Sequence, residues 1–84
     1  MKLKIIIVME GGIIQNVMVN TSVEVLVIDY DVEGADEDRI TKMPYEGEPE
    51  AYCTFPWLEN APDEVENLFT HVENDFNTKD NENS

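Results

Sequence analysis

Residues 3–19 read LKIIIVMEGGIIQNVMV, two runs rich in β-branched residues separated by a pair of glycines. The runs are Leu3–Met9 and Ile13–Val19, each of a length typical of a strand. Gly11 and Gly12 supply the positive φ angles that a two-residue type I′ turn requires. The stretch therefore predicts an N-terminal β-hairpin.

Three further segments are predicted to be strands. Val23–Tyr30 is apolar on both faces, which is typical of a strand in the middle of a sheet. Arg39–Met43 is predicted to be a short strand that Pro44 ends. Ala51–Phe55 is predicted to be a fourth strand, and the proline that follows it indicates a position at the sheet edge.

Pro62–Phe76 has the pattern of an amphipathic helix. Proline suits the first helical position, and the acids of the first turn complement the helix dipole. The apolar residues recur at the spacing of a single helical stripe and are Val65, Leu68, Phe69, Val72 and Phe76. Such a stripe is expected to pack on a sheet face. Residues 77–84 contain no apolar residue and are expected to form a disordered tail.

Together these elements predict an α+β fold. We expect one small domain over residues 1–76. It would contain a three- to four-stranded, mainly antiparallel sheet, built from the N-terminal hairpin and a central strand, with one C-terminal helix packed on a face. A chain of 84 residues buries a limited share of its surface, so its stability should be modest.

The charge of the chain is strongly acidic and unevenly distributed. The formal net charge is −14, and residues 1–28 sum to zero, so all of it follows residue 28. Direct binding to nucleic acid or to an anionic membrane needs Lys and Arg to neutralise phosphates, and the chain has five such residues. Both classes of partner are therefore excluded at the level of sequence.

Nothing in the sequence forms a catalytic motif, so we expect no enzyme and no cofactor. Cys53 is the single cysteine, which excludes an internal disulfide and a thiolate zinc site. His71 has no nucleophile beside it in a recognisable motif. The apolar run after Lys2 and Lys4 is too short for a signal peptide, so a cytoplasmic location is expected.

The sharpest local motif is DYDVEG at residues 29–34, which resembles the first half of an EF-hand calcium loop. The candidate ligands are Asp29, Asp31, Glu33 and Glu37, and Gly34 matches the glycine at position 6. Position 12 of the motif needs a bidentate Glu, but Ile40 stands there. A Ca²⁺ site is thus one interpretation. The alternative is an acidic turn in which Asp and Gly serve turn geometry.

The acids of the middle segment also suggest a binding surface for a basic protein. At i and i+2 of an extended segment, carboxylates lie about 6.7 Å apart and imitate a line of phosphates. The candidate partner-binding residues are Asp29, Asp31, Glu33, Asp36, Glu37 and Asp38, with Trp57 as an apolar anchor. The aromatic cluster of Tyr45, Tyr52, Phe55 and Trp57 either caps the core, which is the favoured interpretation, or forms an exposed patch.

In size and charge the chain resembles small acidic proteins of phages and mobile elements that inhibit restriction enzymes, CRISPR effectors, glycosylases or nucleoid proteins by mimicking DNA. The stretch Glu10-Gly11-Gly12 followed by residues 27–31 also resembles uncharacterised small proteins of bacterial mobile elements. The resemblance implies an acidic protein-binding module whose partner is a basic nucleic-acid-binding protein. The alternatives are a Ca²⁺-binding loop protein, a homo-oligomeric structural module, and a charge that serves solubility alone.

Overall fold

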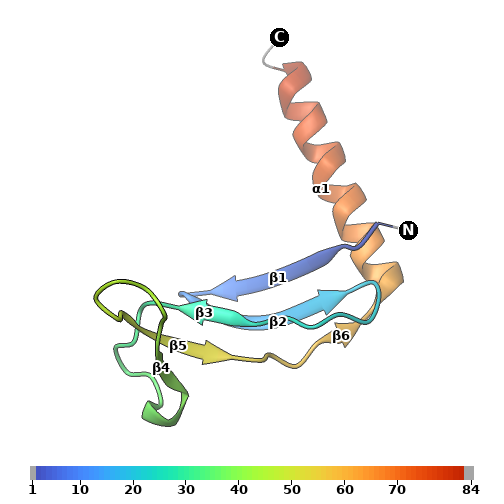
Figure 1. The fold of residues 1–84 in the computed structure, drawn as a ribbon. Helices are drawn as coiled ribbons and strands as arrows, with labels where there is room; N and C mark the ends of the chain where they lie inside the picture. Colours follow the sequence, from blue (N-terminus) through green and yellow to red (C-terminus); the bar gives the residue numbers. More distant parts are fainter. Residues whose placement is uncertain (1, 83–84) are drawn as a thin grey trace. The chain divides into compact units, whose positions relative to one another are not determined.

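The computed structural model describes residues 2–82, and their contacts divide the chain into two compact units. Unit 1 combines Met1–Val23 with Trp57–Ser84, and unit 2 is the intervening Glu24–Pro56. Each unit has a sheet of its own, and the single domain expected over residues 1–76 stays a prediction. The α+β class is confirmed (Figure 1). The expected single sheet of three or four strands is replaced by two three-stranded sheets.

Unit 1 begins with the predicted hairpin. Strands β1 (Ile5–Glu10) and β2 (Ile13–Val19) pair antiparallel, with Glu10 opposite Ile13 across the glycine turn. Gly11 and Gly12 have φ angles of 58° and 77°, as a type I′ turn requires. A bulge between Val8 and Met9 shifts the register. The two-residue strand β6 (Glu59–Asn60) adds to the other edge of β2 in parallel.

The helix α1 (Pro62–Glu82) follows β6 directly. The amide of Ala61 donates to the carbonyl of Val19, and the amide of Val65 donates to the carbonyl of Ala61, so the start of the helix is tied to the end of β2. Val65 is fully buried and forms the core of unit 1 with Val17 and Val19.

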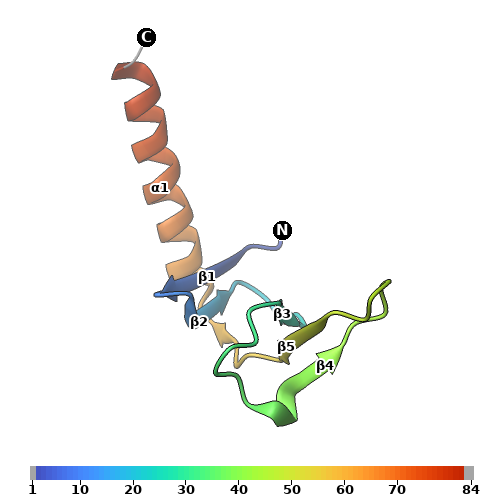
Figure 2. The same cartoon turned by 90° about the vertical axis from the view of Figure 1, so that its left-hand side faces the viewer.

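Only the first turns of α1 are packed. The predicted stripe becomes more exposed along the helix, from 36% at Leu68 through 43% at Val72 to 58% at Phe76. In Figures 1 and 2 the later turns continue away from β1 and β2. The expectation that the helix packs on a sheet face therefore holds for its first turns and is wrong for the rest.

The end of the helix also differs from the expectation. Residues 77–82 are helical, whereas the sequence predicted a disordered tail from residue 77, and the last two residues of that tail lie outside the described part. Lys79 contributes to this turn through an ion pair with Asp75 at 2.8 Å, an i, i+4 arrangement that stabilises helices. No helix within residues 2–82 is long and apolar enough to cross a membrane.

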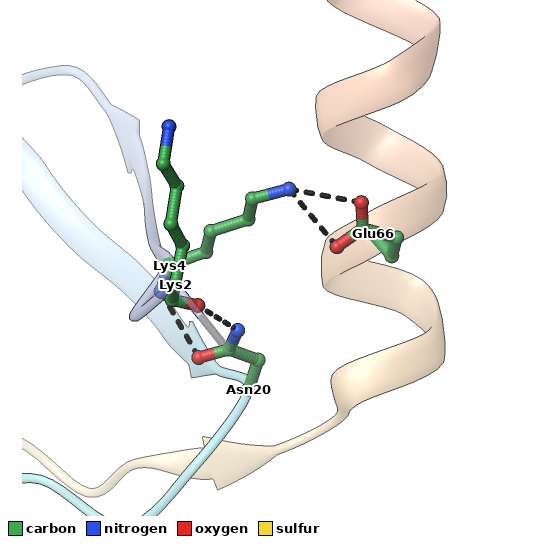
Figure 3. A network of polar contacts seen from close by, with 4 residues as sticks. All are labelled: Lys2, Lys4, Asn20 and Glu66. Carbon is green, nitrogen blue, oxygen red and sulfur yellow. Dashed lines mark hydrogen bonds and ion pairs between the residues drawn. The ribbon is translucent and has the colours of Figure 1, made fainter.

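A polar network closes the open end of the hairpin (Figure 3). The side chain of Asn20 is nearly buried; its Oδ1 accepts from the amide of Lys4 at 3.0 Å, and its Nδ2 donates to the carbonyl of Lys2 at 2.7 Å. The ammonium of Lys4 donates to both carboxylate oxygens of Glu66 at 2.9 and 3.0 Å. The start of β1 is thereby joined to both β2 and α1.

Unit 2 contains the second sheet, in the order β3-β5-β4. The strands β3 (Val27–Asp29), β4 (Ile40–Lys42) and β5 (Glu50–Thr54) are all antiparallel to their neighbours. A single turn of 3₁₀ helix, η1 (Glu37–Arg39), precedes β4. Ala51 on β5 is fully buried.

Two strand positions in unit 2 were predicted wrongly. The central strand is β5, whereas Val23–Tyr30 was expected in the centre and Ala51–Phe55 at an edge. Within Val23–Tyr30 only residues 27–29 form a strand, and they lie at an edge. Pro56 stands beyond the last residue of β5, so its missing N–H leaves both edges of that strand free to pair. The short strand predicted over Arg39–Met43 is confirmed as β4.

Candidate protein-binding surface

The predicted partner-binding acids lie in one connection of unit 2, residues 29–39, which we call the acidic connection. It leaves β3 at Asp29 and enters β4 at Ile40, and both residues are opposite Tyr52 of β5. Because β3 and β4 flank β5 and both run antiparallel to it, they are parallel to each other, and the acidic connection crosses from one edge of the sheet to the other. The register thus fixes both ends of the segment.

Side chains within the acidic connection hold its backbone in local turns. Oδ1 of Asp29 accepts from the amide of Asp31 at 2.9 Å, and Oδ1 of Asp31 accepts from the amide of Glu33 at 3.4 Å. Asp36 caps η1 in the same way, accepting from the amide of Asp38 at 3.2 Å. These are Asx-type hydrogen bonds, which Asp forms readily because its short side chain places an acceptor oxygen near the amide two residues ahead.

The turns correct one expectation about geometry. Only Asp29 belongs to a strand, so the acids do not form the extended i, i+2 line expected from the sequence. The charge is instead carried by a loop whose bends are fixed by hydrogen bonds. Asp29 is partly buried, and the other five predicted partner-binding acids of the loop are exposed.

The carboxylates of unit 2 have few cations to offset them. Residues 24–56 contain ten acids against Arg39 and Lys42, a formal charge of −8. The ion pairs found among the described residues are Lys4–Glu66 and Lys79–Asp75, and both lie in unit 1. Repulsion among the acids of unit 2 is therefore offset only in part by Arg39 and Lys42, without an ion pair among the described residues, and it costs folding free energy.

Most acids of unit 2 lie in the two connections on either side of β4 in the sequence. The acidic connection precedes β4, and Glu46 and Glu48 lie in the loop that follows it. That second loop is closed by a hydrogen bond from the amide of Met43 to the carbonyl of Pro49 at 2.8 Å. Of these two connections, the acidic connection has more carboxylates.

The candidate calcium ligands are not brought together as a metal site. Among residues 2–82, no three His, Cys, Asp or Glu side chains form a group that could hold a metal ion. Asp29 and Asp31 each direct an oxygen to an amide two residues ahead, so successive carboxylates bond to the backbone. The described geometry therefore agrees with the acidic-turn interpretation of residues 29–34.

The exposure of the aromatic residues distinguishes between the core-capping and the surface-patch interpretations. Tyr45, Phe55 and Trp57 are 63%, 76% and 78% exposed, so the favoured interpretation that they cap the core is wrong for these three. Trp57 belongs to unit 1 and the acidic connection to unit 2. Its role as an anchor stays a prediction.

Besides Trp57, an aromatic residue within the acidic connection is exposed, and sequence reasoning did not predict its exposure. Tyr30 lies between Asp29 and Asp31 and is 53% exposed. It was assigned to a central strand, where it would have been buried. The signal that could have placed it outside is the aspartate on each side, because strands disfavour Asp.

Comparison of the chain with protein-family models, with curated proteins and with solved structures found no match.

Proposed function

We propose that the protein is an acidic protein-binding module. Its acidic connection docks on the basic surface with which another protein binds nucleic acid, and so competes with that nucleic acid. The observation that carries the proposal is the charge of unit 2, which is −8 over residues 24–56. Five of the six acids of the connection are exposed, and none is in an ion pair among the described residues. A basic partner would offset the repulsion that the fold leaves in place.

The fixed backbone of the acidic connection supports docking as a shaped surface. A disordered acidic segment loses conformational entropy on binding, whereas a loop already bent by hydrogen bonds loses less. Asp29, Asp31 and Asp36 each constrain the residue two positions ahead. Tyr30, exposed among these carboxylates, supplies the aromatic contact that charge alone lacks.

The test is displacement of labelled duplex DNA from a small basic nucleoid protein of bacteria. The wild-type chain should displace the DNA, with an apparent affinity that falls as salt rises. Lysozyme, a basic protein without a dedicated nucleic-acid-binding site, serves as the control for charge alone. Equal binding to both proteins, or displacement that does not respond to salt, contradicts the proposal.

Two variants of equal charge locate the surface. In the connection variant the six acids become amides; the changes are D29N, D31N, E33Q, D36N, E37Q and D38N. Asn keeps the Oδ1 acceptor, so the turns survive. The matched control removes six exposed acids elsewhere; the changes are E10Q, E24Q, E46Q, E48Q, E50Q and E64Q. The connection variant should lose at least about tenfold in affinity, or about 1.4 kcal/mol, and the control much less. Equal losses would assign the effect to net charge.

Trp57 gives an independent readout because it is the single tryptophan of the chain. Its side chain is 78% exposed, so its fluorescence should report a water-rich environment in the free protein. If it anchors the partner, as predicted, the emission shifts to shorter wavelength on binding, and W57A weakens binding. An unchanged spectrum in the complex removes Trp57 from the interface and leaves the acidic connection as the docking surface.

A further inference from the structure

Unit 1 has an apolar groove that the proposed function does not use. It lies between β1 and the exposed turns of α1 and has a volume of about 430 Å³. Five of its six lining residues are apolar or aromatic; the six are Ile6, Leu68, Phe69, Val72, Glu73 and Phe76. From Leu68 to Phe76 the helix rises about 12 Å, which is the length of two helical turns of a partner.

The helix that forms this groove is poorly stabilised by the chain itself. Beyond the anchored first turns, α1 is rich in residues of middling or low helix propensity, namely Asn67, Thr70, His71, Val72, Asn74, Asp75, Asn77 and Thr78. Leu68, Val72 and Phe76 remain 36–58% exposed, so packing inside unit 1 supplies little in compensation. Helices in proteins depend mainly on packing of an apolar face. The apolar face of the later turns of α1 is left uncovered by the described residues.

The charges around the groove select the kind of occupant. Glu73 lines it and is outside both ion pairs found among the described residues. The two aromatic rings of the groove already accept cations: the ammonium of Lys4 lies 5.1 Å from the centre of the Phe69 ring, and that of Lys79 lies 5.9 Å from the centre of the Phe76 ring. A cation of the ligand is therefore left to pair with Glu73, while the apolar face of the ligand packs on the apolar lining of the groove.

A second copy of the chain is a poor match for the charges around the groove. Each copy carries a formal charge of −14, and pairing two grooves would bring the acidic flanks of two helices together. Like charges at an interface oppose association. The charge of the chain therefore favours a different protein as the occupant.

We infer that this groove binds an amphipathic helix of a partner protein, with apolar residues at helical spacing on one face and Lys or Arg on its flanks. Such a helix buries its apolar face against the stripe of α1 and places a cation near Glu73. This surface belongs to unit 1 and is independent of the acidic connection, so each can be removed without the other.

The test uses three synthetic peptides of about 18 residues, long enough to form a helix on binding. One has leucines at i, i+3, i+4 and i+7 spacing with lysine flanks; the second replaces Leu by Ala, and the third replaces Lys by Glu. Titration of the full-length chain should give binding of the Leu/Lys peptide at least tenfold tighter than of either other peptide. Equal binding of the Ala/Lys peptide would show charge attraction alone and overturn the inference.

Variants of the chain place the binding in the groove. V72D and F76D should each weaken the Leu/Lys peptide at least tenfold, and E73Q should weaken it less. T70D is the matched control, because it adds the same charge to an exposed position of α1 outside the groove and should change affinity little. Both residues replaced in the groove are already exposed, so the fold should survive, and far-UV circular dichroism checks this. Equal effects of V72D, F76D and T70D would overturn the inference.

Two further measurements separate this inference from its competitors. The connection variant with six amides must bind the Leu/Lys peptide as the wild type does, once salt is raised to screen long-range attraction. If it loses that binding, the peptide docks on unit 2. Light scattering over a wide concentration range should show a monomer. A dimer that V72D abolishes would make the occupant a second copy.

Discussion

Replacing Val65 and Val72 by alanine tests how far the helix is packed. Both valines lie on the apolar stripe of α1, but Val65 is fully buried and Val72 is 43% exposed. The same two carbon atoms are removed at each site, within one helix. Any difference in the free energy of unfolding therefore reports the surroundings of the side chain.

The magnitudes follow from burial. At Val65 the loss of two buried carbons costs about 1.6 kcal/mol. The cavity left behind adds about 1 kcal/mol. The higher helix propensity of Ala returns about 0.6 kcal/mol. V65A should therefore destabilise the protein by about 2 kcal/mol. At Val72 little more than half of the transfer cost applies and no closed cavity forms, so V72A should cost about 0.3 kcal/mol.

Urea denaturation followed by far-UV circular dichroism measures both values, because α1 dominates the helical signal. In thermal melts, 2 kcal/mol corresponds to a loss of about 8–16 °C for a chain of this size. If V72A costs as much as V65A, the later turns of α1 are packed and the groove does not exist in solution. If V65A costs as little as V72A, the helix is not anchored at its start.

Three further outcomes are expected. G12A should lower stability by about 1–2 kcal/mol because φ at Gly12 is 77°, and G12N, which tolerates that angle better, should lose less. N20A removes the two hydrogen bonds that Asn20 makes to Lys2 and Lys4 and should cost about 1–3 kcal/mol in urea denaturation; the exposed N67A provides the comparison. Calcium at about 5 mM should leave the melting temperature unchanged, and a rise that D31N abolishes would restore the calcium interpretation.

Local sequence signals predicted the local elements well. The glycine pair of the hairpin and the proline that begins α1 are both found where expected, because each acts within a few residues of itself. The turns of the acidic connection follow the same rule, since Asp bonds an amide two positions ahead. These features needed no knowledge of the rest of the chain.

The same reasoning did not predict which strands pair when they are far apart in the sequence. The residues Glu59 and Asn60 have no sequence pattern typical of a strand. They nevertheless pair with Met18 and Val19 of β2, which are both buried. The apolar character of Val23–Tyr30 indicated a central strand, but five of its eight residues form no strand and the other three lie at an edge. In the candidate sites, the acids were predicted as residues, whereas the groove was missed because an apolar helical stripe was assumed to find a sheet along its whole length.

The discontinuity of unit 1 imposes an order on folding. During synthesis β1 and β2 are made before the rest of unit 1 and can pair across their two-residue turn. Residues 24–56, which are made next, contain all three strands of the second sheet. The contacts of β6 and Val65 with β2 close a much larger loop and have to wait for the carboxyl-terminal third of the chain. A chain truncated after Pro56 would therefore contain all of unit 2 but only the first segment of unit 1.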